Sequence, residues 1–157
     1  MIHVILKFII NMKKYDIVIV SGGFDPVHKG HVRMFKGAKK LGHKVIAGAN
    51  SDKWLVNKKG KAFMPFAERA EIISEFQSID EVMAFRDDAE GSAIQLLTQI
   101  QQLYPNNTIA FANGGDRVVG NTPEQGFCNA YNIDMLWNIG GGKVQSSSDL
   151  LKKANKI

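Results

Sequence analysis

The sequence predicts an α/β protein built on a doubly wound parallel sheet of about five strands, and three observations support this class. Short apolar runs typical of buried parallel strands alternate with segments whose apolar residues recur at helical spacing. Polar or glycine-containing loops follow the expected strands at 21–31, 50–52 and 113–117. The length of 157 residues suits one domain with one core.

Composition places the chain among folded globular proteins and favours small anionic partners. Hydrophobic residues make up 45% and charged residues 22% of the sequence, which are ordinary values for such a domain. The net charge of +5 favours anionic ligands. Because no basic patch is interleaved with aromatic residues, we expect no nucleic-acid partner. With Cys128 as its one cysteine, the sequence allows no intramolecular disulfide and no cysteine-rich zinc site, so we expect a cytoplasmic location.

Residues 1–14 are expected to form an extension ahead of one domain over 15–157. Residues 1–10 are apolar but too few to cross a bilayer, and they lack the basic start and the cleavage site of a signal peptide. We therefore expect no membrane partner. A second methionine, Met12, leads directly into the first strand, and we hypothesise that it is the natural start. The intact mass of the protein from its native source tests this hypothesis.

The expected elements alternate in type along the chain. The apolar run at 17–20 predicts a buried strand, and the spacing that follows predicts a helix over 30–41 that ends at Gly42. Within 118–130 the sequence indicates only a short helix start at Pro123 and Glu124. The three glycines at 140–142 predict a flexible break. The remaining strands are expected at 44–49, 79–85, 108–112 and 133–139, and the remaining helices at 66–76, 91–104 and 146–155.

Two interpretations fit the lysine-rich stretch at 53–61, which Gly60 interrupts. A run of lysines is typical of a solvated loop. The alternative is a mobile flap that folds its lysines over phosphate oxygens when a nucleotide binds.

The loop at 21–31 carries the most distinctive chemistry. Gly22 and Gly23 allow a sharp turn and a close approach to a ligand, and His28 and His31 lie three positions apart at the start of a helix. Amide groups at a helix N-terminus attract anions, and imidazoles placed there can donate hydrogen bonds to phosphate oxygens. The plainer alternative is a tight turn whose histidines are satisfied locally. The pattern predicts a phosphate-binding site.

The string Gly-x-Phe-Asp-x-x-His-x-Gly-His, at residues 22–31, resembles the signature of the cytidylyltransferase-like nucleotidyltransferases. The chain from Tyr15 onward looks like one such domain. It is similar to the glycerol-3-phosphate cytidylyltransferases and to the adenylyltransferases that activate heptose 1-phosphate. The resemblance implies a Rossmann-like fold of the HxGH nucleotidyltransferase type.

The resemblance also implies roles for individual residues. His28 and His31 would stabilise charge on the α-phosphate, and Lys58 and Lys61 stand where the family has catalytic flap lysines. Asp52 and Asp80 would contact the acceptor. We expect Mg²⁺ to enter with the nucleoside triphosphate, no metal site in the protein itself, and a homodimer. The nucleotide-binding positions implied are Gly22, Gly23, Phe24, Asp25, Gly30, Arg69, Gly115, Asp116, Ser146, Ser147 and Ser148.

The implied reaction transfers a nucleoside monophosphate from ATP or CTP to a phosphorylated acceptor, a sugar phosphate or glycerol 3-phosphate, and releases pyrophosphate. Two departures from the cytidylyltransferase pattern weigh against CTP. Lys143 rather than an arginine precedes the serines, and Gln77 and Ser78 stand where an arginine is often found. The loops at 50–52 and 114–116 look more like those of the heptose enzymes. The alternatives are a non-catalytic nucleotide-binding module, and an FMN or pantetheine-phosphate adenylyltransferase.

Overall fold

A computed structural model describes residues 1–5, 12–120 and 122–156. Within these residues the chain forms a five-stranded sheet in the order β3-β2-β1-β4-β5, with every pairing parallel. This confirms the predicted class. The elements are β1 (Tyr15–Gly22), α2 (Lys29–Leu41), β2 (Gly42–Ala49), α3 (Asp52–Lys59), α4 (Phe66–Ser74), β3 (Glu81–Ala84), α5 (Ile94–Leu103), β4 (Ile109–Ala112), α6 (Gln125–Ala130), β5 (Asp134–Leu136) and α7 (Ser147–Ala154).

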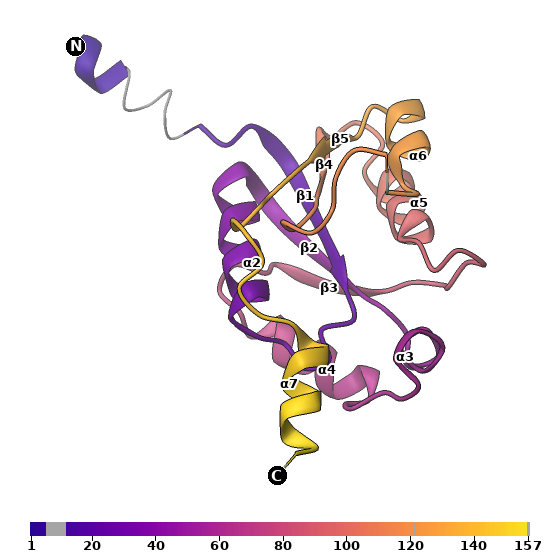
Figure 1. Cartoon of the computed structure of the whole chain (residues 1–157). Helices are drawn as coiled ribbons and strands as arrows, with labels where there is room; N and C mark the ends of the chain where they lie inside the picture. The colour runs from indigo at the N-terminus through magenta and orange to yellow at the C-terminus, as the bar shows by residue number, and fades with distance from the viewer. Residues whose placement is uncertain (6–11, 121, 157) are drawn as a thin grey trace.

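Helices cover both faces of the sheet, with α2 on one side and α5 and α6 on the other (Figure 1). Successive side chains of a strand point to opposite faces, so β1 contributes to two separate cores. Val18 packs in one core with Phe35 of α2 and Ile73 of α4. Ile19 packs in the other with Leu97 of α5. Burial on both faces explains why the strands are continuous apolar runs rather than alternating ones.

The order of the strands places a crevice between β1 and β4. The chain runs outward from β1 to β2 and β3, then returns to the opposite side of β1 to form β4 and β5. The connections therefore leave β1 and β4 in opposite directions, and the carboxyl ends of these two strands are where ligands bind in sheets of this kind.

The lysine-rich stretch is not a solvated loop, because most of it forms the helix α3, while its interpretation as a mobile flap stays a prediction. Ser51 caps this helix, since its Oγ accepts a hydrogen bond from the Trp54 amide at 3.0 Å. Leu55 anchors the helix, because its side chain is fully buried and packs closely on Gly23. A Cβ at Gly23 would lie only 2.8 Å from Cδ2 of Leu55. Gly60 ends the helix with a φ of 87°, a conformation that favours glycine.

The glycines at 140–142 are not simply a break, because Gly140 packs directly on α2. A Cβ at Gly140 would lie 2.6 Å from the Met34 backbone nitrogen, and the φ of 86° also requires glycine. This contact holds the segment between β5 and α7 across the start of α2.

The described part of the chain contains no helix that is both long and apolar enough to cross a membrane.

Candidate active site

A cleft of about 360 Å³ opens at the carboxyl ends of β1 and β4. Its walls come from the end of β1, the first turns of α2, the last turn of α3, the loop after β4 and the segment between β5 and α7. The fold thus brings the glycine-rich loop near the start of the domain against the serines near its end. The wall residues are 21–22, 28, 30–31, 34, 58–59, 112–117 and 139–148.

His28 and His31 form the capping box of α2. The Nδ1 atom of His28 accepts a hydrogen bond from the Gly30 amide at 3.1 Å, and Nδ1 of His31 accepts one from the His28 amide at 3.1 Å. A ring nitrogen that accepts carries no proton, so the proton of each neutral imidazole is on Nε2. The two rings stack with their centroids 3.8 Å apart. Both therefore hold an Nε2–H donor that the backbone contacts do not use.

The surroundings keep both imidazoles neutral. Burial, followed by the influence of His28 and Lys59, lowers the pKa of His31 from 6.5 to about 3. Burial, Lys59 and Lys143 also lower the pKa of His28. Neutral imidazoles stabilise an anion as hydrogen-bond donors rather than as imidazolium cations.

Gly30 and Phe24 set the position of this pair. A Cβ at Gly30 would lie 2.9 Å from Cε1 of His28, so glycine is needed for the ring to reach back over the helix terminus. Phe24 adopts a φ of 52° and is buried, and its ring meets that of His31 edge-on with centroids 5.0 Å apart. Gly22 lines the cleft, whereas Gly23 and Phe24 are not on its wall, and their roles as nucleotide contacts stay predictions.

Lysines from two directions give the cleft a positive charge. Lys58 and Lys59, on the last turn of α3, and Lys143 line it. The Lys58 ammonium also lies 4.4 Å from the centroid of the Trp54 ring. Burial is the first cause of a lowered pKa at both Lys58 and Lys59. Lys61 lies beyond the end of α3 and outside the cleft wall, so Lys59 rather than Lys61 joins Lys58 there.

Asp25 and Arg69 make structural contacts and do not line the cleft, so the nucleotide-binding roles that the resemblance implied for them stay predictions. Asp25 is 1% exposed, and its two carboxylate oxygens accept the amides of Phe63 and Met64 at 2.6 and 2.7 Å. Its carboxylate is therefore already used to hold the segment before α4.

Arg69 is fully buried beneath the first loop. Its guanidinium donates to the carbonyls of Met64, Gly23 and Asn50 and to the Asp52 carboxylate, at 2.7 to 2.9 Å. These bonds join the loop after β1 to the loop after β2 and to α4. Asp52 is the partner of this buried cation, and the acceptor contact predicted for it stays a prediction.

Asp80 is also placed away from the cleft. It precedes β3, at the end of that strand opposite to the cleft. Its carboxylate accepts the Val45 amide and the Lys39 ammonium, each at 2.7 Å. These contacts join β2, α2 and the start of β3, so Asp80 lies away from the cleft and its acceptor role stays a prediction.

Two of the three serines make structural hydrogen bonds, and all three line the cleft. Ser146 caps α7 through the Asp149 amide at 3.1 Å. Ser147 donates from Oγ to the Pro26 carbonyl at 2.7 Å, which ties α7 to the first loop. All three serines lie on the cleft wall, and so do Gly115 and Asp116. The nucleotide-binding roles of these five residues stay predictions.

Several polar wall residues were missing from the predicted set, among them Ser21 and Gln145. Lys59, Asn113, Arg117 and Lys143 line the cleft. Each is next to a predicted or noted residue, yet only the structure shows which neighbour faces inward.

A second cavity of about 640 Å³ adjoins the cleft. It shares Lys58, Asp116 and Arg117 with the cleft and continues to Trp54 and to the loop at 87–91.

Comparison with known proteins decides the family. The family model described as cytidylyltransferase-like matches residues 19–142. The chain belongs to the cytidylyltransferase-like family. Membership confirms the family that the loop at 22–31 predicted.

One curated relative in the family is the bifunctional protein HldE of Blochmanniella floridana. It is 32% identical over 122 residues, which are 74% of this chain and 24% of that protein. The chain thus spans about a quarter of the length of the curated relatives that it matches.

Two solved structures show the same fold. The lipopolysaccharide core biosynthesis protein from Thermoplasma volcanium has a TM-score of 0.59 at 22% identity, with coverage of 78% of this chain and 93% of that one. The bifunctional NMN adenylyltransferase/ADP ribose pyrophosphatase from Francisella tularensis, complexed with AMP and an Mn ion, has a TM-score of 0.63 at 20% identity. That match covers 91% of this chain and 43% of the other.

Proposed function

We propose that this protein transfers a nucleoside monophosphate from ATP or CTP to a small phosphorylated acceptor and releases pyrophosphate. The observation that carries the proposal is the pair of neutral imidazoles at the N-terminus of α2. Their Nε2–H donors are unused by the capping box, and the cleft that His28 and His31 line is cationic. Donors fixed in advance, at a helix terminus, suit an oxygen whose negative charge grows during reaction.

The reaction we infer is a direct displacement. A phosphate oxygen of the acceptor attacks the α-phosphorus, and the bond from that phosphorus to the pyrophosphate oxygen breaks in line. The protein positions the reactants and neutralises charge, so no covalent intermediate with a side chain is needed. His28 and His31 donate to the α-phosphate, Lys58 and Lys59 meet the β- and γ-phosphates, and Ser148 at the start of α7 faces the same cleft.

A divalent metal ion fits this site as a companion of the triphosphate rather than as a resident of the protein. No group of three His, Cys, Asp or Glu side chains that could hold a metal occurs within 1–5, 12–120 and 122–156. Asp116 supplies a carboxylate on the cleft wall. Mg²⁺ typically binds one or two carboxylates together with substrate phosphates and water, so Asp116 is the residue that would hold it. The ion would neutralise charge on the leaving pyrophosphate.

The cavity that adjoins the cleft is where we place the acceptor. It adjoins the cleft at Lys58, Asp116 and Arg117, so an acceptor that lies toward Trp54 would bring its phosphate next to the triphosphate in the cleft. Sugar phosphates are the first acceptors to test, because the resemblance includes the heptose enzymes. ATP is the first nucleotide to test, because the Francisella neighbour holds AMP.

The experiment is an assay of Mg²⁺-dependent pyrophosphate release. ATP and CTP are each crossed with heptose 1-phosphate, other sugar phosphates, glycerol 3-phosphate, FMN and phosphopantetheine, and the products are identified by mass. We expect release that depends on one nucleotide and one acceptor. Nucleotide binding without release across the panel would contradict transfer to these acceptors and favour the non-catalytic module.

A further inference from the structure

The buried carboxylate of Glu124 joins the body of the protein to the cleft. Glu124 is 1% exposed, in the segment just before α6. Its Oε1 accepts the Ala93 amide at the start of α5 at 2.8 Å, and its Oε2 lies 3.2 Å from Nη1 of Arg117. A buried carboxylate is strongly destabilising unless it is paired and hydrogen-bonded. Arg117 supplies that pairing from the loop after β4.

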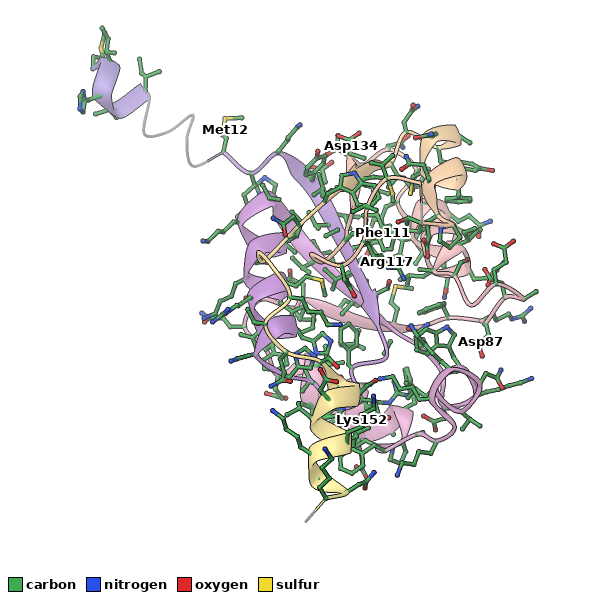
Figure 2. The ribbon with its side chains drawn as sticks, in the orientation of Figure 1. Met12, Asp87, Phe111, Arg117, Asp134 and Lys152 are labelled. Atoms are coloured by element: carbon green, nitrogen blue, oxygen red, sulfur yellow. The ribbon has the colours of Figure 1, made fainter. Side chains whose placement is uncertain are left out.

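Arg117 is the exposed end of this pair. Its side chain is 40% exposed, against 1% for Glu124. It lies on the walls of both the cleft and the adjoining cavity. Figure 2 places Arg117 near the middle of the molecule in this view, between Phe111 on β4 and Asp87. A guanidinium has five N–H donors, so the bond to Glu124 leaves the others for a ligand.

On the cleft side the surroundings of Arg117 favour an anion, because Lys58, Lys59 and Lys143 line that wall against the single carboxylate of Asp116. The carboxylates of Asp87, Asp88 and Glu90 also line the adjoining cavity. Lys58 lines both cavities beside it, and after burial the guanidinium is the second cause that lowers the pKa of the Lys58 ammonium. The two cations repel each other, Asp116 offsets part of this repulsion at Lys58, and an anion bound between them would remove more of it. The planar fork of a guanidinium matches two phosphate oxygens at once, and a partner fixed by burial orients that fork before the ligand arrives.

We propose that Arg117 binds phosphate oxygens at the junction of the cleft and the adjoining cavity, and that Glu124 is the residue that positions it. The identity of the ligand as a nucleoside triphosphate rests on the proposed function, whereas the phosphate chemistry does not. Glu124 does not touch the ligand and acts through Arg117.

The test measures binding of ATP and of inorganic triphosphate by calorimetry to the wild type, Arg117→Ala, Arg117→Lys, Glu124→Gln and the double variant Arg117→Ala/Glu124→Gln. Arg33→Ala, an exposed arginine on α2 outside both cavities, is the matched control. We expect Arg117→Ala to raise both dissociation constants about tenfold or more, and Arg117→Lys to raise them less. Glu124→Gln keeps an acceptor for Ala93 but loses the charge that orients Arg117, so it weakens binding by part of that amount.

The double variant separates positioning from mere stability. If Glu124 acts through Arg117, its substitution weakens binding in the wild type and adds nothing once Arg117 is alanine. Thermal unfolding is recorded for each variant, and if Glu124→Gln fails to fold, the Arg117 variants still decide the phosphate contact.

Three results would overturn the proposal: no binding of triphosphate to the wild type, equal binding by Arg117→Ala and Arg33→Ala, or the same loss from Glu124→Gln with and without Arg117. The proposed function can fail independently. Triphosphate binding that depends on Arg117 without nucleotidyl transfer would refute the reaction and leave this inference standing.

Discussion

At the scale of single residues, the backbone determines how the two histidines can act. Because each Nδ1 accepts an amide hydrogen, each neutral ring presents its proton at Nε2. The same bonds satisfy the first amides of α2, so the sequence interpretations of a locally satisfied turn and of a phosphate site are compatible. One ring nitrogen of His28 and of His31 serves the fold, and the other is available for chemistry.

Substitution at His28 separates these two duties. His28→Asn keeps a side-chain acceptor for the Gly30 amide but has no donor at the Nε2 position, so we expect normal folding and a kcat lower by about a hundredfold. His28→Gln, whose amide reaches further, should recover part of that loss. Steady-state kinetics with thermal unfolding measure both, and a near-wild-type kcat in His28→Asn would refute the assigned role.

Acid should destabilise the protein partly through His31. The pKa of about 3 in the folded state lies below the ordinary 6.5, so the unfolded chain binds a proton first as the pH falls. The stability that His31 allows is present above about pH 6.5 and is lost progressively toward pH 3, by up to about 1.4 kcal/mol per pH unit.

Urea denaturation at pH 7, 6 and 5 measures this effect. We expect the free energy of unfolding to fall more steeply for the wild type than for His31→Asn, which cannot take up that proton and keeps an acceptor for the His28 amide. The carboxylates titrate alike in both proteins, so parallel slopes would contradict the prediction.

Arg69 should matter for stability before it matters for nucleotide binding. Arg69→Lys removes most of the donors that hold the carbonyls of Gly23, Asn50 and Met64, and we expect it to lower the free energy of unfolding by about 3 kcal/mol. Arg33→Lys on the surface is the control. Urea denaturation compares the two, and equal stabilities would contradict the structural role.

The sequence alone indicates which charged residues lie near the site, where they belong to a motif. It does not show which of their side chains are buried. Asp25 and Arg69 are a carboxylate and a guanidinium in the right neighbourhood, but only three-dimensional packing shows that their polar atoms face the protein. Arg117 and Glu124 could not be paired from sequence, because the loop between them carries no periodic pattern and the pairing depends on the start of α5.

At the scale of elements, α3 shows why strands were easier to predict than this helix. Strands buried on both faces are long apolar runs, whereas α3 has Leu55 as its fully buried anchor and three lysines in eight residues. The capping residue Ser51 was visible in the sequence. A cap without an apolar stripe is a weak helix signal, so the lysines dominated the interpretation.

Two adjacent glycines in the loop after β4 give a matched pair for testing how loops form the cleft. A Cβ at Gly115 would lie 2.8 Å from the Gly141 carbonyl oxygen, whereas one at Gly114 would meet only the Asp116 carboxylate at 3.7 Å. We expect Gly115→Ala to push the loops apart and to lower kcat/KM about tenfold or more, since small displacements of this kind are costly. Gly114→Ala should stay close to the wild type, and similar losses in the two variants would contradict this account.

At the scale of the whole molecule, the position of the cleft follows from strand order. The apolar runs predicted a doubly wound sheet, and the loops at 21–31 and 113–117 meet because β1 and β4 are neighbours with their carboxyl ends together. That edge was predictable from the sequence. The extent of the cleft was not, because the segment between β5 and α7 reaches it through contacts of Gly140 with α2 and of Ser147 with the first loop.

The most direct test of the central claim follows two radioactive labels through the reaction. The preferred nucleotide, labelled with ³²P at the α- or at the γ-phosphate, is incubated with Mg²⁺ and the acceptor found in the panel, and the products are separated. Attack at the α-phosphorus predicts that the α label enters the acceptor product and the γ label leaves in pyrophosphate, and that both products form about a hundredfold more slowly in His28→Asn. A γ label in the acceptor product, or in free phosphate, would show attack at the γ-phosphorus and contradict nucleotidyl transfer.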